Sequence, residues 1–236
     1  MAIYETLGMR RVINAAATLT RLGGSLMPPP VIAAMADAAH SFVDLEELQQ
    51  RIGERIATLT NNQACYVSCG AAAGIAQAVA GCISGLDPQR IAGFPHVAAD
   101  AEVLVHAGQR NGYDYAIRQT GAHLVEFGSR NGATAAELAA AITPRTVCIV
   151  YFAGAHFAAG AVPLAEALAI AHAHGVPLIV DAAAQIPPIS NLWYFSRDLG
   201  VDLAIFSGGK GLRGPQSAGL GLGLFFGPRD VALLPG

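Results

Sequence analysis

Short apolar runs and longer mixed stretches alternate along most of the chain, and their lengths predict strands and helices in turn. The apolar runs predict strands at Cys65–Ser68, Val103–His106, His123–Phe127, Val147–Phe152, Pro177–Val180, Leu203–Phe206 and Leu220–Phe226. The stretches between them predict helices at Ala71–Ser84, Tyr113–Thr120, Ala135–Ile142 and Leu164–His174. Continuous apolar strands separated by helices are typical of a parallel sheet with both faces covered. We therefore predict an α/β fold with three layers, α/β/α, and a mostly parallel seven-stranded sheet.

The N-terminal region has a different pattern, in which helices follow a proline-rich segment. Pro28–Pro30 precedes an apolar stretch, Val31–Phe42, that predicts a helix, because proline suits the first helical turn. A second predicted helix, Glu46–Thr60, has its apolar residues at helical spacing. We predict an N-terminal arm with the first helix in residues 1–45 and a single large domain in residues 46–236.

The composition narrows the class of protein. Hydrophobic residues make up 53% of the chain, which excludes a disordered protein, and the net charge of −3 provides no basic surface for nucleic acid. The segment Thr58–Leu86 carries no charge, but small and polar residues dominate it, so we expect buried elements there and not a membrane span.

The four cysteines indicate the compartment. They form no CxxC pair and are too sparse for a disulfide framework, so a reducing cytoplasm is expected. The N-terminal sequence has no secretory layout either. No set of residues with metal-ligand spacing is visible.

The segment Ser68–Gly74 is a candidate anion-binding turn. It runs from a predicted strand directly into a helix, and its small residues would let backbone N–H groups approach an anion at the helix N-terminus. A tightly packed helix start would need the same small residues, so this pattern alone does not decide between the two interpretations.

Two further strand ends carry charged residues. Asp181 follows an apolar run and would lie at the rim of the sheet, either as a cap or turn residue or as a carboxylate that keeps a heteroaromatic nitrogen protonated. Lys210 is the only lysine of the chain and stands in Ser207-Gly208-Gly209-Lys210-Gly211, just past a buried strand. A desolvated lysine at such a place can form a Schiff base.

The order of anion-binding turn, strand-end aspartate and strand-end lysine resembles the fold type I pyridoxal 5'-phosphate (PLP) enzymes, the aspartate-aminotransferase-like superfamily. Closer features resemble its SelA-like branch, which includes the selenocysteine synthase and D-glucosaminate-6-phosphate ammonia-lyase types. The residues that carry the resemblance are Val12–Ala15, Thr18–Ser25, Ser68–Ala73, Asp181–Ala183, Ser207–Lys210 and Gly214–Gln216.

The resemblance implies roles at the cofactor. Lys210 would hold PLP as a Schiff base and move protons, and Asp181 would pair with the pyridinium nitrogen. Ala183 would pack on the ring and Gln185 would reach the ring hydroxyl. The cofactor phosphate would lie against Ser207 and the turn residues Cys69, Gly70, Ala71 and Ala72.

Other polar residues are weaker candidates. By analogy His106 would stack on the ring, although a satisfied core histidine is an equal alternative. The candidates for substrate binding are Asn14, Thr20, Arg21, Arg110 and Arg213. A solvated loop remains the simpler interpretation for Arg110.

The resemblance leaves three functional hypotheses. The first is a PLP-dependent lyase that acts on a small anionic amino acid or amino sugar acid and yields a 2-keto acid and ammonia. The second is a transferase of the L-seryl-tRNA(Sec) selenium transferase type, which the low positive charge disfavours. The third is an incomplete or inactive fold type I protein, because family members continue into a C-terminal small domain that we do not find in these 236 residues. The resemblance also implies a homodimer or a higher homo-oligomer.

Overall fold

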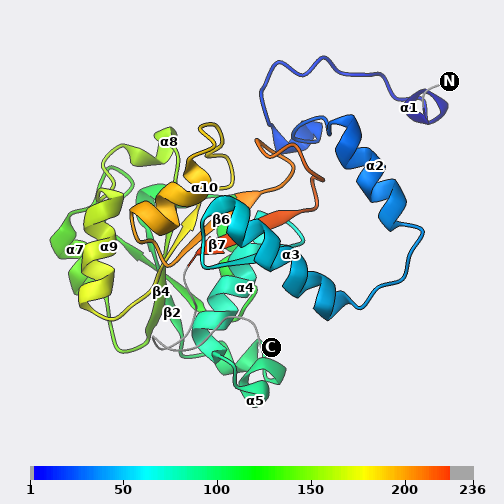
Figure 1. Cartoon of the computed structure of the whole chain (residues 1–236). Coiled ribbons are helices and arrows are strands. Elements are labelled where there is room, and N and C mark those ends of the chain that lie inside the picture. The colour runs from blue at the N-terminus through cyan, green and yellow to red at the C-terminus, as the bar shows by residue number, and fades with distance from the viewer. Residues whose placement is uncertain (1–2, 224–236) are drawn as a thin grey trace.

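The computed structural model describes residues 3–223, and a seven-stranded sheet runs through their centre (Figure 1). The strands are β1 (Ala64–Ser68), β2 (Glu102–His106), β3 (His123–Phe127), β4 (Thr146–Phe152), β5 (Leu178–Asp181), β6 (Leu203–Ser207) and β7 (Gly219–Gly223). Their order in the sheet is β1-β7-β6-β5-β4-β2-β3. Only β7 pairs antiparallel, with β1 and β6. The predicted mostly parallel sheet is confirmed.

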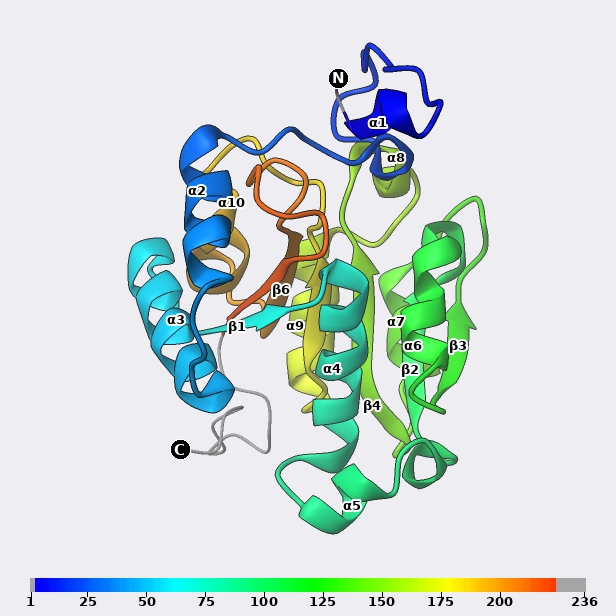
Figure 2. The same ribbon diagram turned by 90° about the vertical axis from the view of Figure 1, so that its right-hand side faces the viewer.

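Helices cover both faces of this sheet, as the three-layer prediction requires (Figure 2). The longer helices are α2 (Pro29–Ala38), α3 (Leu45–Thr60), α4 (Ala71–Ser84), α7 (Ala135–Ala141) and α9 (Leu164–Ala173). The short ones are α1 (Ile3–Thr6), α5 (Pro88–Ala92), α6 (Tyr115–Arg118), α8 (Ala155–Ala158) and α10 (Asn191–Trp193). None of these described helices is both long and apolar enough to span a membrane.

Successive side chains along each strand alternate between the two faces of the sheet, and this alternation divides the hydrophobic core into two clusters. Val103 of β2 lies in the cluster that contains Ile75 of α4, whereas its neighbour Leu104 lies in the cluster that contains Leu138 of α7. Successive side chains of a strand point to opposite faces, so one strand contributes to both clusters. The apolar runs of the sequence are therefore strands buried on both sides.

The helix boundaries differ from the predicted ones where local capping decides them. The helix α3 begins after Asp44, whose side chain accepts hydrogen bonds from the amides of Glu46 and Glu47. The helix predicted over Tyr113–Thr120 is instead a 3-10 turn, η4 (Gly112–Asp114), followed by the single turn α6. The last predicted strand ends at Gly223 in the described part, and its remaining residues lie outside the described residues.

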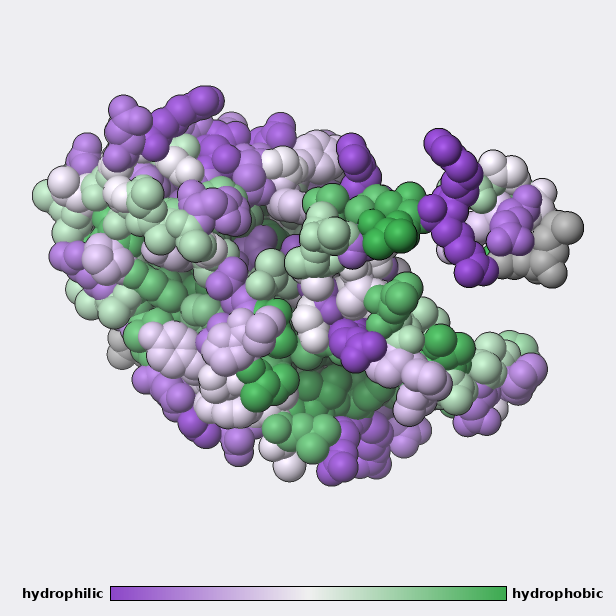
Figure 3. Space-filling view, turned by 90° about the horizontal axis from the view of Figure 1, so that it is seen from above, coloured by the Kyte–Doolittle hydropathy of each residue, from purple (hydrophilic) through white to green (hydrophobic). Residues whose placement is uncertain are grey.

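The N-terminal arm lies largely apart from the domain (Figures 1 and 3). Its large apolar side chains face outward: Ile13 is 97% exposed, Leu26 is 87% exposed and Phe42 is fully exposed. The arm touches the domain around Ser25, whose amide donates a hydrogen bond to the Gly209 carbonyl at 2.8 Å. The domain boundary between residues 45 and 46 stays a prediction.

Candidate active site

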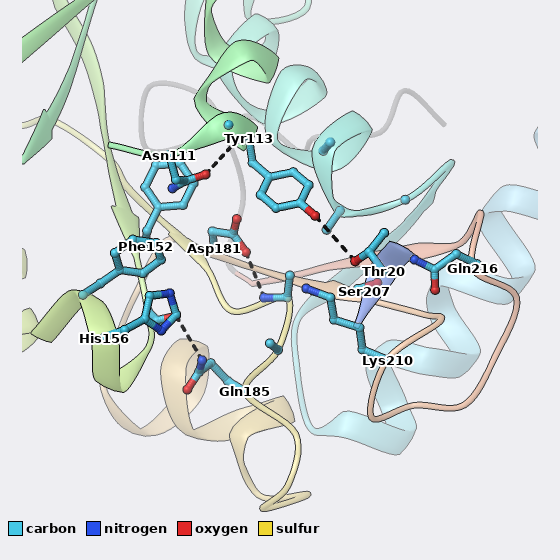
Figure 4. A pocket seen from close by; sticks show the side chains of 18 residues that line it. Thr20, Asn111, Tyr113, Phe152, His156, Asp181, Gln185, Ser207, Lys210 and Gln216 are labelled. Carbon is cyan, nitrogen blue, oxygen red and sulfur yellow. Dashed lines mark hydrogen bonds between the residues drawn. The ribbon is translucent and has the colours of Figure 1, made fainter. Parts of the chain in front are cut away.

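A cavity of about 420 Å³ opens at one edge of the sheet (Figure 4). The strands β1, β4, β5 and β6 run in the same direction, so their carboxyl ends meet there. Open α/β sheets bind ligands at this edge, and the volume lies in the range of small-molecule sites. The lining residues are Thr20, Gly70, Ala71, Ala72, Asn111, Gly112, Tyr113, Phe152, Ala153, His156, Phe157, Asp181, Ala183, Ala184, Gln185, Ser207, Lys210 and Gln216.

Asp181 ends strand β5 and points its carboxylate into the cavity (Figure 4). The residue is only 9% exposed, and its Oδ1 accepts a hydrogen bond from the Ala183 amide at 2.9 Å. Burial raises the pKa of this carboxyl, while the Ala183 amide and the charge of Lys210 act in the opposite direction. Asp181 is thus both a turn residue and a buried carboxylate that a cationic group in the cavity would stabilise.

Lys210 is held by a tight loop that follows strand β6. The Gly208 amide donates to the Ala218 carbonyl at 2.7 Å, and the Gly214 amide donates to the Gly208 carbonyl at 2.7 Å. A Cβ atom on Gly209 would lie 2.4 Å from the Cα of Gln216, so the close approach of the two chain segments requires glycine there. The loop fixes the backbone of Lys210 while its half-buried side chain reaches the cavity.

The start of helix α4 supplies backbone donors. Gly70 has a φ of 107°, which favours glycine, and Ala71 and Ala72 line the cavity at the first helical turn. The first N–H groups of a helix have no partner within the helix and attract anions. Buried Ser207 lines the same cavity.

These groups together fit PLP. A buried carboxylate, an amine and an anion-binding helix start match a ring nitrogen, an aldehyde and a phosphate, and all three border one cavity of suitable volume. Ala183 and Gln185, which were also predicted to bind the cofactor, line the cavity as well. The Gln185 Nε2 donates to the Ala153 carbonyl at 3.0 Å, which fixes the orientation of the side chain.

Two predicted cofactor contacts lie outside the lining. Cys69 is exposed and precedes the turn. His106 is 2% exposed and packs against Phe127 with ring centroids 5.6 Å apart. Neither ring nitrogen of His106 has a hydrogen-bond partner in the structure. Contacts of these two residues with the cofactor remain predictions.

Of the residues predicted to bind substrate, Thr20 lines the cavity and the others do not. The Asn14 side chain is bonded within its own turn, to the Ala16 amide and the Ala17 carbonyl. The Arg110 guanidinium is paired with Asp114 and Glu126. Arg213 donates to the Leu26 carbonyl at 3.4 Å, and Arg21 lies on the exposed arm.

Several lining residues were not predicted to form the site. They include Tyr113, Phe152, His156, Phe157 and Gln216. Phe152 ends strand β4 and His156 follows it on α8, so the rule that sites form at strand ends would have indicated this segment. Tyr113 has no such signal, because a loop after β2 brings it to the cavity.

Comparison with known proteins identifies relatives over most of the chain. The sequence profile of the family described as Aminotransferase class-V matches residues 33–232. D-glucosaminate-6-phosphate ammonia lyase of Salmonella typhimurium (strain 14028s / SGSC 2262) is 37% identical over 221 residues, which cover 91% of this chain and 58% of that protein. The 5'-C-glycyluridine monooxygenase-decarboxylase of a Streptomyces species is 39% identical over 223 residues, which cover 91% of this chain and 54% of that protein.

A solved structure has the same fold. A structure of D-glucosaminate-6-phosphate ammonia-lyase superposes with a TM-score of 0.87 at 34% identity, and the match covers 95% of this chain and 61% of that one. The chain therefore spans between 54% and 61% of the length of these two relatives and of the chain in the solved structure.

Proposed function

The chain belongs to the class-V aminotransferase family, and on this premise we propose that it is a PLP-dependent lyase acting on an amino acid or amino sugar acid. The observation that carries the proposal is the meeting of Asp181, Lys210 and the start of helix α4 around one cavity. The similarity to D-glucosaminate-6-phosphate ammonia lyase favours this reaction class.

Each group of the proposed cofactor has a matching residue. The amides of Gly70, Ala71 and Ala72, with the Ser207 hydroxyl, would bind the phosphate. The carboxylate of Asp181 would pair with the ring nitrogen, and this pairing would relieve the cost of burying an unpaired charge. Lys210 Nζ would be the attachment point.

The chain's own residues would then position the substrate and move protons. When bound, PLP supplies an electron sink that stabilises negative charge on the carbon next to the substrate amine. Lys210 Nζ would take a proton from that carbon, and the apolar side chains of Phe152 and Phe157, which line the cavity, would help to exclude water. A 2-amino-3-hydroxy acid would lose water across its Cα–Cβ bond, and hydrolysis would release ammonia and a 2-keto acid.

The proposal is tested by adding PLP to the purified chain. We expect a visible absorbance band that Lys210→Ala abolishes and Arg213→Ala, a substitution in the same loop, retains. With D-glucosaminate 6-phosphate as the probe, ammonia and keto acid should form. Absence of the band in the wild type would overturn the proposal and favour an incomplete or inactive protein. A band without turnover of this probe or of any other 2-amino-3-hydroxy acid would leave cofactor binding in place and overturn the lyase.

The alternative transferase on seryl-tRNA is less favoured by the charge of the chain. Tight binding to nucleic acid depends on neutralising phosphates with lysine and arginine, and the net charge here is −3. Salt-sensitive binding of seryl-tRNA in a filter assay would reverse this ranking.

We also propose a homodimer or larger assembly located in the cytoplasm. Most of the exposed large apolar side chains of the described residues lie on the arm and on α2, where a second subunit would cover them. The four cysteines are free thiols, which is consistent with a reducing compartment. A monomeric mass in light scattering of the PLP-loaded chain would contradict the assembly.

A further inference from the structure

Three segments that are distant in the sequence meet beside Lys210. They are the arm residues Thr20–Ser25, the turn Asn111–Asp114 and the loop Gly208–Gln216. Tyr113 lies where they converge, with its hydroxyl toward Thr20 and its ring beside the amine of Lys210 (Figure 4).

The arm is firmly attached at this point. The Ser25 hydroxyl lies 3.0 Å from the Gly209 carbonyl oxygen and 2.8 Å from that of Lys210. A Cβ atom on Gly24 would lie 2.2 Å from the Gly209 carbonyl oxygen, so the arm packs directly on the backbone of the lysine loop. Thr20 is therefore held near the cavity although most of the arm is exposed.

The backbone of Tyr113 is fixed as well. The Asn111 Oδ1 accepts a hydrogen bond from the Tyr113 amide at 2.8 Å. The next residue, Asp114, is 3% exposed and pairs with Arg110 and Arg118. The Tyr113 side chain, by contrast, is 50% exposed. The backbone of Tyr113 is thus fixed, whereas the hydroxyl end of its side chain is accessible to a ligand.

The hydroxyl and ring of Tyr113 make only weak contacts within the chain. The Tyr113 hydroxyl lies 3.5 Å from the Thr20 hydroxyl, at the long limit for a hydrogen bond. The Lys210 Nζ lies 5.9 Å from the ring centroid, within the range of a cation–π contact. Each hydroxyl can both donate and accept, so the pair can exchange its mutual contact for a shorter bond to a ligand oxygen.

The chemistry of this wall indicates the kind of ligand group. Apart from Lys210, which the proposed cofactor would occupy, the polar side chains of the described residues that line the cavity on this side are Thr20, Asn111, Tyr113 and Gln216, and none of these four carries a charge. Neutral hydroxyl and amide groups suit hydroxyl oxygens better than a second carboxylate, for which arginine is the usual partner.

We propose that Tyr113, assisted by Thr20, determines specificity by binding a hydroxyl group on the carbon next to the reacting carbon of the substrate. This inference rests on the proposed function, because it requires an amine substrate held by the cofactor beside Lys210. A site that hydrogen-bonds a hydroxyl discriminates against the analogue that lacks it, since a polar group then loses its partner.

The test compares two probes that differ by one hydroxyl, D-serine and D-alanine. Their apparent dissociation constants are measured by stopped flow from the initial change in the visible band of the PLP-loaded chain, before D-serine is consumed. We expect the wild type to bind D-serine about two- to tenfold more tightly than D-alanine, which is the effect of one hydrogen bond. Tyr113→Phe should bring this ratio close to one and leave the affinity for D-alanine and the cofactor band unchanged.

Matched variants separate recognition from a general structural effect. Tyr115→Phe alters an exposed tyrosine two residues away that lies outside the lining, and it should behave as wild type. Thr20→Val should reduce the ratio, and the double variant should lose no more than Tyr113→Phe. A normal band with an unchanged ratio in Tyr113→Phe would overturn the inference alone, and so would a ratio of one in the wild type. Absence of the band in the wild type would overturn the proposed function together with the inference.

Discussion

The cavity has two sides that are built from different parts of the fold. What we name the strand side consists of Gly70–Ala72, Asp181, Ala183 and Ser207, which directly follow strands β1, β5 and β6 or end them. The loop side consists of Thr20, Asn111, Tyr113, His156 and Gln216, which come from the arm, from the short helical turns η4 and α8, and from loops. Asp181 and Ser207 are less than 10% exposed, whereas Tyr113 is 50% exposed.

This difference separates two tasks. A site for a constant cofactor benefits from groups held by a packed sheet, because small displacements cost activity. A site for a variable substrate can be altered by changes in loops without disturbing the core. We infer that relatives with different reactions share the strand side more closely than the loop side.

The largest expected effect comes from a change on the strand side. Asp181→Asn retains the oxygen that accepts from the Ala183 amide and removes only the charge. We expect kcat to fall by about 10²–10³-fold, as when one preorganised electrostatic contact is removed, while the cofactor band remains. Steady-state kinetics checks this, with the exposed Asp100→Asn as control. Equal kcat values for the two variants would remove Asp181 from the mechanism.

A second change tests how the arm is attached to the lysine loop. Gly23 and Gly24 have φ values of 90° and 72°, so alanine strains the backbone at both positions. A Cβ atom meets nothing within 4 Å at Gly23 but would lie 2.2 Å from the Gly209 carbonyl oxygen at Gly24. We expect Gly24→Ala to lower kcat/KM by up to about 10²-fold through displacement of Thr20, and Gly23→Ala to have a much smaller effect. Equal losses would show that this close packing does not position the loop side.

The same division explains how much the sequence could predict. The sheet and the positions of Asp181, Ser207 and Lys210 follow from apolar runs that end in polar residues, because strand ends of a parallel sheet share one edge. Tyr113 and Gln216 could not be predicted in this way, since their place depends on how loops pack. Arg110 shows the converse limit: the sequence offers a loop arginine as a candidate for substrate binding but cannot reveal that its guanidinium pairs with Asp114 and Glu126 of the same chain.

Gln109 links the sheet to the cavity wall, and its substitution should have a smaller effect, on the stability of the fold. Gln109 is fully buried, and its Oε1 accepts a hydrogen bond from the Phe152 amide at 3.1 Å. This bond joins the segments that follow the paired parts of strands β2 and β4. Gln109→Leu leaves this buried amide unpaired and should destabilise the fold by about 1–3 kcal/mol. Urea unfolding measures the loss, with exposed Gln119→Leu as control. An unchanged stability would mean that the Phe152 wall is held by β5 alone.

The buried carboxylate of the strand side also predicts a pH dependence for the chain without PLP. Burial raises the pKa of Asp181 in the folded state, so this residue contributes stability that is fully present below the ordinary aspartate pKa and is lost as pH rises through the raised value. Asp181→Asn should therefore unfold at a higher temperature than wild type at neutral pH, and the difference should vanish at about pH 3, below the usual aspartate pKa. Thermal unfolding across this range checks the sign, and a variant less stable at pH 7 would contradict it.

The smallest effect on activity is expected at Arg110, which the sequence offered as a weaker candidate for substrate binding beside the simpler interpretation of a solvated loop. Its guanidinium donates to Asp114, whose side chain is 5% exposed, and pairs with Glu126 at the surface. Binding a substrate anion would require breaking these pairs and leaving the Asp114 carboxylate with Arg118 at 3.5 Å. Arg110→Gln should thus lower stability by about 1–3 kcal/mol, the cost of leaving a buried polar group short of a partner, and leave KM nearly unchanged. A large increase in KM with unchanged stability would instead assign Arg110 to the substrate and extend the loop side beyond the cavity lining.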